Sequence, residues 1–242
     1  MNNYVSLSQY PGKQGQYFYT SFFNLYNIDA DYSPLGATPD NLTDKIRHAV
    51  DSGVKGISVS MPFKRSVIDL LDVVDTEVDD YQSCNTIVIN NGKLFGHNAD
   101  LAGVKYIAYK LKHPKVAILG DGSIGKMFAQ FLSRDDKFMV NVYSRSLGNW
   151  DSRHTDADVV INCTALGTVD STSPLDTVDS NTKMIVDLSI KPGKLFEQST
   201  QAGIDYISGQ DFYKQQFIKQ FWLYTGIDID PADYDKIAQA RT

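Results

Sequence analysis

Short apolar runs separated by helical patterns occupy the second half of the chain. Val116–Gly120 is a continuous apolar run, the pattern of a parallel strand that is covered on both faces. Lys126–Leu132 follows it with apolar residues at helical spacing. The alternation of strands with helical or irregular stretches predicts a doubly wound parallel sheet. Its further predicted strands are Met139–Tyr143, Val159–Cys163 and Met184–Leu188.

The first half of the chain predicts a second α/β unit. Asn41–Val50 carries its apolar residues on one helical face. Asn91-Gly92 separates two apolar segments, which is a strong signal for a two-residue hairpin. The predicted strands are a segment around Tyr32, then Gly56–Val59, Thr86–Asn90 and Lys93–Gly96.

Two helices mark the limits of the units. Asp100 stands where the N-cap of the helix Leu101–Leu111 is expected, and His113-Pro114 ends that helix at a hinge. Phe212–Tyr224 is a strongly apolar, aromatic helix, which we expect to pack back on the first domain. We therefore predict a first domain of residues 1–101, completed by residues 210–242, and a second domain of residues 102–209.

Composition and charge exclude several classes of protein. The net charge of −6 argues against a nucleic-acid-binding surface, because binding phosphates requires clustered lysines and arginines. No apolar run approaches the roughly 20 residues that cross a bilayer, and no secretory signal is visible at the N-terminus. Cys84 and Cys163 lie far apart and match no metal-ligand spacing, so we expect no metal site. We expect both thiols to be free and reduced, which is consistent with a cytoplasmic protein. These features are compatible with a monomer or a homodimer.

A glycine-rich loop, Gly120-Asp121-Gly122-Ser123-Ile124-Gly125, joins the apolar strand to the next helix. In a dinucleotide site the first glycine allows a tight turn and the second lets the backbone approach a pyrophosphate. The third allows close packing of helix on strand. Glycines also gather in ordinary turns. The strand before this loop and the helix after it favour a Rossmann-type dinucleotide site over a structural turn, because the helix N-terminus supplies N–H donors.

The end of the next strand bears on the choice between NAD and NADP. An NAD enzyme has a carboxylate there that accepts from the ribose 2′-OH, whereas this chain has Tyr143-Ser144-Arg145-Ser146. A guanidinium with two hydroxyls suits a 2′-phosphate, which favours NADP(H) over the alternative of a solvated surface arginine. Asp121 is an irregularity, because it puts into the phosphate loop a carboxylate that could weaken cofactor affinity.

Lys64 and Asp100 are candidates for acid–base chemistry. Reducing a ketone with a nicotinamide needs a proton donor at the carbonyl oxygen, and a lysine serves if its pKa is tuned toward neutrality. Lys64 follows Pro62-Phe63 at a strand end, and Asp100 could orient its ammonium group and hydrogen-bond a substrate hydroxyl. Taken singly, each has a plainer explanation as a solvated or capping side chain.

Short motifs recur in a fixed order over most of the chain. Ser58–Lys64 reads Ser-Val-Ser-Met-Pro-Phe-Lys, Gly96–Asp100 reads Gly-His-Asn-Ala-Asp, and Phe221–Gly226 reads Phe-Trp-Leu-Tyr-Thr-Gly. These segments resemble the N-V-T-x-P-F-K, G-x-N-T-D and F-x-x-W-T-G motifs of the shikimate dehydrogenase family. Further matches to that family are Ser83–Thr86, the glycine loop, Ser144–Ser146, Asn162–Gly167 and the segment from Gly209 to Gln216.

The resemblance implies an NADP-dependent oxidoreductase acting on CH–OH donors, with an N-terminal α/β substrate domain and a Rossmann-type NADP domain. It makes Lys64 the acid/base and Asp100 its partner, and it places Ser60, Asn85 and Gln216 in the substrate site. The expected reaction is the reversible reduction of 3-dehydroshikimate to shikimate, a step of aromatic amino-acid and chorismate biosynthesis. The implied cofactor residues are Gly120, Gly122, Ser123, Ile124, Gly125, Ser144, Arg145, Ser146, Thr164, Leu188 and Gly209.

The departures from the family pattern concern the substrate. The family's two carboxylate-binding serines align with Lys13-Gln14-Gly15, and Ser6-Leu7-Ser8 lies too far upstream to match without an insertion. A substrate-contacting tyrosine of the family is replaced by Ile190. Lys13, a backbone amide, Tyr17 or Tyr19 could bind the carboxylate, or the substrate could be quinate or another cyclic hydroxy-acid. A non-catalytic nucleotide-binding relative is a further alternative, against which the retained acid/base pair weighs.

Overall fold

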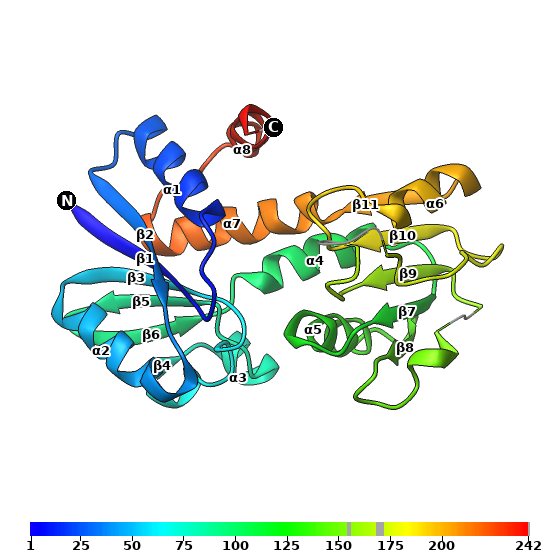
Figure 1. Cartoon of the computed structure of the whole chain (residues 1–242), viewed down its shortest axis with the longest axis horizontal. Coiled ribbons are helices and arrows are strands. Elements are labelled where there is room, and N and C mark those ends of the chain that lie inside the picture. The colour runs from blue at the N-terminus through cyan, green and yellow to red at the C-terminus, as the bar shows by residue number, and fades with distance from the viewer. Residues whose placement is uncertain (154–155, 168–171, 242) are drawn as a thin grey trace. The chain divides into compact units, whose positions relative to one another are not determined.

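The protein folds into two compact units. The computed structural model describes residues 1–153, 156–167 and 172–241 (Figure 1). Residues 1–99 and 217–242 form the first unit, and residues 100–216 form the second. The predicted domain boundaries were 101/102 and 209/210. Helix α7 (Gly209–Thr225) contributes residues to both units.

The first unit is built on a mixed six-stranded sheet. Its strands are β1 (Asn2–Ser8), β2 (Ala30–Gly36), β3 (Val54–Val59), β4 (Val73–Val74), β5 (Thr86–Asn90) and β6 (Lys93–His97). The spatial order is β2-β1-β3-β5-β6-β4. β1 pairs in parallel with β2 and β3, whereas β5 is antiparallel to both of its neighbours. The helices of this unit, apart from its part of α7, are α1 (Gln14–Leu25), α2 (Leu42–Asp51), α3 (Thr76–Tyr81) and α8 (Pro231–Ala240).

The predicted hairpin between β5 and β6 is confirmed. Asn91 and Gly92 connect the two strands with φ angles of 50° and 75°. A type I′ turn requires positive φ at both central residues, and asparagine and glycine tolerate that conformation best. Local sequence chemistry therefore determines the register of this pair of strands.

An aromatic cluster in the first unit joins α1 to the C-terminal part of α7. Phe217 and Phe221 are one helical turn apart, and their ring centroids lie 4.9 Å and 5.6 Å from that of Phe22. Phe22 and Phe221 are fully buried. The prediction that this helix packs on the first domain is confirmed for its residues from Phe217 onward, whereas Phe212 packs on Phe128 in the second unit. Burial of several aromatic side chains dominates the stability of such a core.

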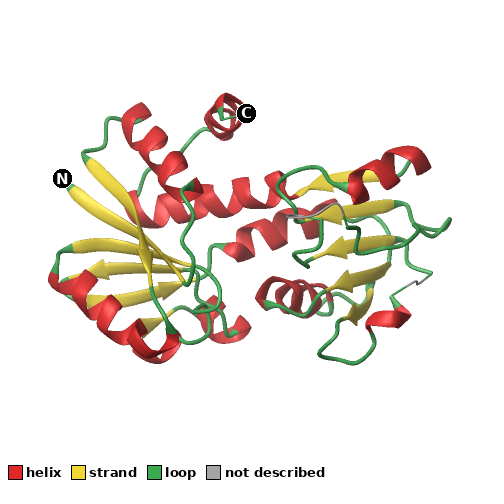
Figure 2. Cartoon of the chain, in the orientation of Figure 1, coloured by secondary structure: helices red, strands yellow, loops and turns green. Residues whose placement is uncertain are grey.

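The second unit is a five-stranded sheet that is wholly parallel (Figure 2), and its parallel arrangement was predicted. Its strands are β7 (Lys115–Leu119), β8 (Met139–Tyr143), β9 (Val159–Asn162), β10 (Met184–Asp187) and β11 (Asp205–Ser208). The spatial order is β8-β7-β9-β10-β11, so successive strands are added on opposite sides of β7. Its helices are α4 (Asp100–Lys110), α5 (Ser123–Leu132), α6 (Lys194–Ala202) and the N-terminal part of α7.

The structure corrects one local prediction and adds elements that the hydrophobic pattern did not reveal. Helix α4 begins at Asp100, so this residue is the first helical residue and not the cap before Leu101. Its carboxylate remains in the first turn, where the helix dipole favours negative charge. Strands β1 and β11 and helix α1 were not predicted. β11 has only four residues, too few to show a periodic pattern.

Candidate active site

The three glycines of the loop after β7 have different structural roles. Gly120 has a φ of +98°, which a turn can demand and a side chain disfavours. A Cβ at Gly125 would lie 2.1 Å from the carbonyl oxygen of Gly120, so only glycine lets the helix approach the turn this closely. Gly122 is the N-cap of α5, and a Cβ there would meet nothing within 4 Å. The second glycine therefore leaves open space beside the helix N-terminus.

A pocket of about 430 Å³ lies beside this loop within the second unit. It is bordered by the segments that follow β7, β8 and β9. Since β8 and β9 lie on opposite sides of β7, the pocket occupies the point where the strand order reverses, the usual ligand site of open α/β sheets. The lining residues are Gly120, Asp121, Ser144, Arg145, Ser146, Trp150, Thr164, Ala165 and Leu166.

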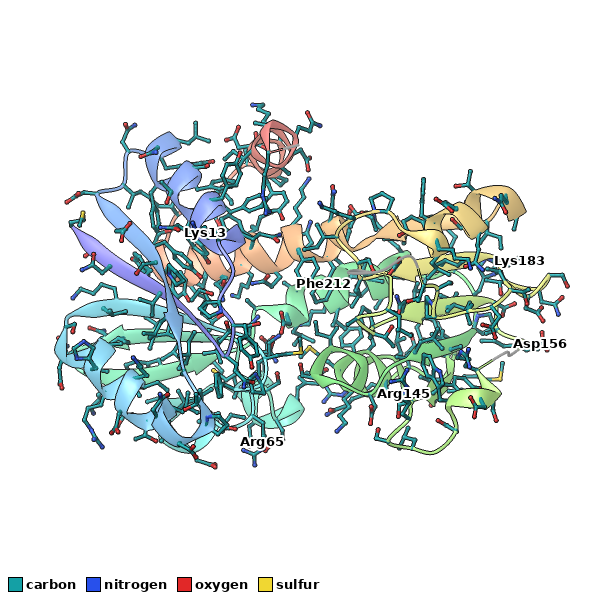
Figure 3. All side chains as sticks on the ribbon, in the orientation of Figure 1. Lys13, Arg65, Arg145, Asp156, Lys183 and Phe212 are labelled. Atoms are coloured by element: carbon teal, nitrogen blue, oxygen red, sulfur yellow. The ribbon has the colours of Figure 1, made fainter. Side chains whose placement is uncertain are left out.

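The turn after β8 is held by side-chain hydrogen bonds. Ser144 N donates to Asn149 Oδ1 at 2.9 Å, and Asn149 Nδ2 donates to Val142 O at 2.9 Å. The hydroxyls of Ser144 and Ser146 lie 2.9 Å apart. Arg145, between these two serines, is exposed (Figure 3). All three residues of this turn, Ser144, Arg145 and Ser146, line the pocket.

The carboxylate of Asp121 also belongs to this pocket. Ser146 Oγ donates a hydrogen bond to Asp121 Oδ2. This hydrogen bond lowers the pKa of Asp121, with smaller contributions from Ser144 and from the charge of Lys126, so the side chain is anionic at neutral pH. The sequence showed this residue to be irregular but did not reveal which side chain it contacts.

The loop after β9 is anchored by a buried polar network. Asn162 Oδ1 accepts from Thr164 N and Oγ1 at 3.0 Å and 2.7 Å, and Asn162 Nδ2 donates to Asp187 Oδ1 at 2.9 Å. This arrangement presents Thr164 to the pocket. Gly209 lies against the strand end, because a Cβ there would meet Leu188 O at 2.5 Å. Thr164 therefore lies at this pocket of the second unit, whereas Leu188 and Gly209 meet each other beyond the residues that line it.

The first unit has a pocket of about 520 Å³ at the end of β1. Ser60, which we expected at the substrate site, lines it, and its backbone N donates to Leu7 O at 2.9 Å. None of the described residues that line it is charged. The lining residues are Ser6, Ser8, Gln9, Tyr10, Gly12, Gln14, Gly15, Ser60, Met61 and Pro62.

Ser6 and Ser8 line this pocket, although their position along the chain argued against it. β1 pairs with β3 in parallel, with Ser6 opposite Ser58, so the serines of β1 approach Ser60 by strand pairing. The tyrosines considered as replacements have other partners. Tyr17 donates to Ile237 O at 3.1 Å, and Tyr19 donates to Gln220 Oε1 at 2.9 Å.

Asn85 is buried beside a network that sequence reasoning missed. Its Oδ1 accepts from Ala99 N at 2.8 Å and from Thr86 Oγ1 at 2.7 Å. Its Nδ2 forms no hydrogen bond with another described residue. Gln220 Nε2 donates to Thr86 Oγ1 at 2.7 Å and to Asn85 O at 3.1 Å. No sequence motif marked Gln220; it lies one helical turn after Gln216 on α7.

Lys64 and Asp100 have well-defined settings in different units. The backbone of Lys64 is held in place on both sides. The preceding residue, Phe63, is buried, and Lys64 O accepts a hydrogen bond from Cys84 N at 2.8 Å. Asp100 is 3% exposed. Burial, together with the charges of Asp100 and Cys163, raises the pKa of Tyr213 to about 12. The carboxylate of Asp100 therefore acts electrostatically on a tyrosine of its own unit.

In the part of the chain that the structure describes, no group of three or more histidine, cysteine or acidic side chains could hold a metal ion. No helix among the described residues is long and apolar enough to span a membrane.

Comparison with known proteins gives consistent matches. Residues 14–87 match the model of the shikimate dehydrogenase substrate binding domain. The shikimate dehydrogenase (NADP(+)) of Pelodictyon phaeoclathratiforme is 30% identical over 226 residues, covering 80% of each chain. That of Thermococcus kodakarensis is 28% identical over 230 residues, covering 86% of this chain and 85% of the relative. The structure of Thermus thermophilus shikimate 5-dehydrogenase in complex with NADP(H) and shikimate matches with a TM-score of 0.85 at 20% identity, covering all of both chains.

Proposed function

The chain belongs to the shikimate dehydrogenase family, and on that premise we propose that it catalyses the reversible NADP-dependent reduction of 3-dehydroshikimate to shikimate. The observation that carries the proposal is the nucleotide pocket at the switch point of the parallel sheet, with a glycine loop on one side and Ser144-Arg145-Ser146 on another. Lys64 and Asp100 supply the proposed acid–base chemistry.

The residues of this pocket fit NADP. The N-terminus of α5 offers backbone N–H groups and positive dipole to a pyrophosphate, and the open space beside Gly122 permits its approach. Arg145 would pair with the 2′-phosphate, and Ser144 and Ser146 would donate hydroxyl hydrogen bonds to it. When bound here, the nicotinamide would supply the hydride for reduction of the carbonyl carbon.

Lys64 is the proposed acid and base. Its ammonium group donates a proton to the carbonyl oxygen during reduction, and the neutral amine takes the proton back from the hydroxyl during oxidation. Asp100 stabilises the ammonium group and accepts a hydrogen bond from a substrate hydroxyl. The anchored backbone on both sides of Lys64 supports this role, because a positioned donor loses less entropy than a mobile one.

Further polar residues are proposed to hold the remaining substrate groups. Ser60 and the free Nδ2 of Asn85 would hydrogen-bond ring hydroxyls, and Gln216 would add an amide. Ser6 and Ser8 would take over the carboxylate in place of the two serines that the family carries further along the chain. The predicted domain limits, cytoplasmic location, role in aromatic amino-acid biosynthesis and monomeric or dimeric state remain predictions.

A second candidate is a related reaction on quinate or another cyclic hydroxy-acid. The departures at the carboxylate end favour it, because Lys13-Gln14-Gly15 stand where the family has its two serines and Ile190 stands where it has a tyrosine.

Steady-state kinetics separate the two candidates. Oxidation of shikimate and of quinate is followed by the absorbance of the reduced nicotinamide, with NADP and with NAD. The proposal expects the highest kcat/KM for shikimate with NADP. Turnover of quinate without turnover of shikimate would establish the second candidate, and turnover of neither acid would overturn the proposed reaction and its quinate version.

A further inference from the structure

The nucleotide pocket holds a carboxylate that its proposed function does not require. Asp121 follows the first glycine of the loop and lines the same pocket as Arg145 and Ser146. Its side chain points across the pocket, because Oδ2 accepts a hydrogen bond from Ser146 Oγ. The hydroxyl proposed to bind the 2′-phosphate is thus already donating to an anion of the chain itself.

This position has a clear electrostatic consequence. A phosphate monoester carries about −1.5 to −2 charges at neutral pH. The carboxylate of Asp121 would repel that charge. It would also compete with the phosphate for the hydrogen bond that the Ser146 hydroxyl donates. The cationic groups that oppose this repulsion are Arg145 at the pocket and Lys126, whose charge also acts on Asp121.

The same carboxylate suits a ribose that carries no phosphate. In NAD-binding sheets of this type, an acidic side chain accepts a hydrogen bond from the ribose 2′-OH, and it stands at the end of the second strand. Here the end of β8 has no acid, but Asp121 reaches the side chains of that turn from the glycine loop. The pocket therefore contains both the cation typical of an NADP site and the anion typical of an NAD site.

Resting on the proposed function, we propose that Asp121 is a specificity-determining residue that weakens binding of the NADP 2′-phosphate and accepts a hydrogen bond from the 2′-OH of NAD. Arg145 and Asp121 act in opposite directions, and their balance sets the cofactor preference. The enzyme accordingly binds both cofactors, with a smaller preference for NADP than Arg145 alone would give.

Direct binding to Asp121→Asn tests the proposal, because asparagine keeps the size of the side chain and removes its charge. Titration of the full-length protein with NADPH and with NADH, followed by nicotinamide fluorescence, gives both dissociation constants without turnover. We expect the Kd for NADPH to fall about tenfold and the Kd for NADH to rise several-fold. The difference in NADPH affinity between Asp121→Asn and the unsubstituted protein should become smaller at high salt, because salt screens the interaction of partly exposed charges.

Two further variants separate charge from structure. Asp205→Asn removes a charge of the same sign at the exposed start of β11, on the opposite edge of the parallel sheet, and should leave both dissociation constants unchanged. Ser146→Ala breaks the same hydrogen bond but keeps the carboxylate, and it should weaken NADPH binding. If Asp121 served only to hold the turn, both Asp121→Asn and Ser146→Ala would weaken both cofactors.

The outcomes also distinguish this inference from the proposed function. Unchanged or weaker NADPH binding by Asp121→Asn, with an unaltered circular dichroism spectrum, overturns the role of Asp121 alone. Absence of NADPH and NADH binding by the unsubstituted protein overturns the proposed function and this inference with it. Isothermal titration with adenosine 2′,5′-bisphosphate and with AMP should show the same changes in dissociation constant for Asp121→Asn as NADPH and NADH do. These probes contain only the adenosine end of the cofactors.

Discussion

Substitution of the third loop glycine by alanine separates the packing role of the loop from its binding role. In Gly125→Ala the new Cβ would lie 2.1 Å from Gly120 O and 3.0 Å from Gly120 C. Both atoms belong to the backbone, so the N-terminus of α5 must move away from the turn by almost an ångström. Gly122→Ala is the matched control, because a Cβ there meets nothing within 4 Å and the backbone has a φ of −63°.

Two opposing effects determine how much Gly125→Ala changes the free energy of unfolding. Overpacking against a rigid neighbour costs about 1–3 kcal/mol, and the backbone clash places Gly125→Ala at the upper end of that range. Alanine gains up to about 1 kcal/mol of helix propensity over glycine. We expect a net loss of about 2 kcal/mol in the free energy of unfolding of the second unit. With an m-value of about 2 kcal/mol/M, the urea midpoint falls by about 1 M. Gly122→Ala should stay within about 0.5 kcal/mol of the unsubstituted protein.

Tryptophan fluorescence can report on the second unit by itself. The chain has two tryptophans, of which Trp150 lines the nucleotide pocket and Trp222 belongs to the first unit. Urea unfolding in a Trp222→Phe background therefore follows Trp150. Trp222 is 41% exposed, so this background change is mild.

Binding of NADPH completes the test. Both glycine variants should bind it at least about tenfold more weakly, Gly125→Ala through displacement of α5 and Gly122→Ala through loss of the space beside the helix N-terminus. An unchanged urea midpoint in Gly125→Ala would refute the packing argument. Unaltered NADPH affinity in Gly122→Ala would refute the assignment of the loop to the pyrophosphate.

Three further predictions concern the proposed chemistry and the core. Lys64→Ala should lower kcat by about 10²–10⁴-fold and leave the Kd for NADPH nearly unchanged; near-normal turnover would contradict its role as acid and base. Arg145→Ala should raise the KM for NADPH by about 10–100-fold and that for NADH far less; equal effects on the two cofactors would contradict a 2′-phosphate site. Burial raises the pKa of Tyr32 from 10.0 to about 12. The unfolded chain therefore loses this proton first, and stability that is fully present below pH 10.0 falls by roughly 3 kcal/mol up to about pH 12. Urea unfolding of Tyr32→Phe should show a shallower loss over this pH range, and an identical pH profile would contradict the assignment.

Elements with strong local signals were predictable from the sequence. The strands β7, β8 and β9 are short apolar runs, and the Asn91-Gly92 hairpin depends on two residues that accept positive φ. Helix ends were less certain, as Asp100 shows, because a helix boundary depends on hydrogen bonds that a periodic pattern does not specify.

The polar pockets could be predicted only in part. Motifs identified Ser60 and the loop after β8 as candidates, but counting along the chain placed Ser6 and Ser8 too far upstream. The parallel pairing of β1 with β3 brings these serines to Ser60, and nothing in the local sequence specifies that pairing. Gln220 was missed for the same reason, because its partner Tyr19 is 201 residues away in the chain.

The sequence by itself determined the parallel sheet, the glycine loop and the residue types available for hydride-transfer chemistry. These features depend on hydrophobic period and backbone conformation, which act over a few neighbouring residues. Only the tertiary structure decided which side chains share a pocket. It brought Asp121 into hydrogen-bond contact with Ser146 in the nucleotide pocket, and it brought Ser6 and Ser8 into the same pocket as Ser60. Strand order and loop geometry determine such contacts, because they bring together residues that are distant in the sequence. These contacts decide which ligand groups a pocket can bind.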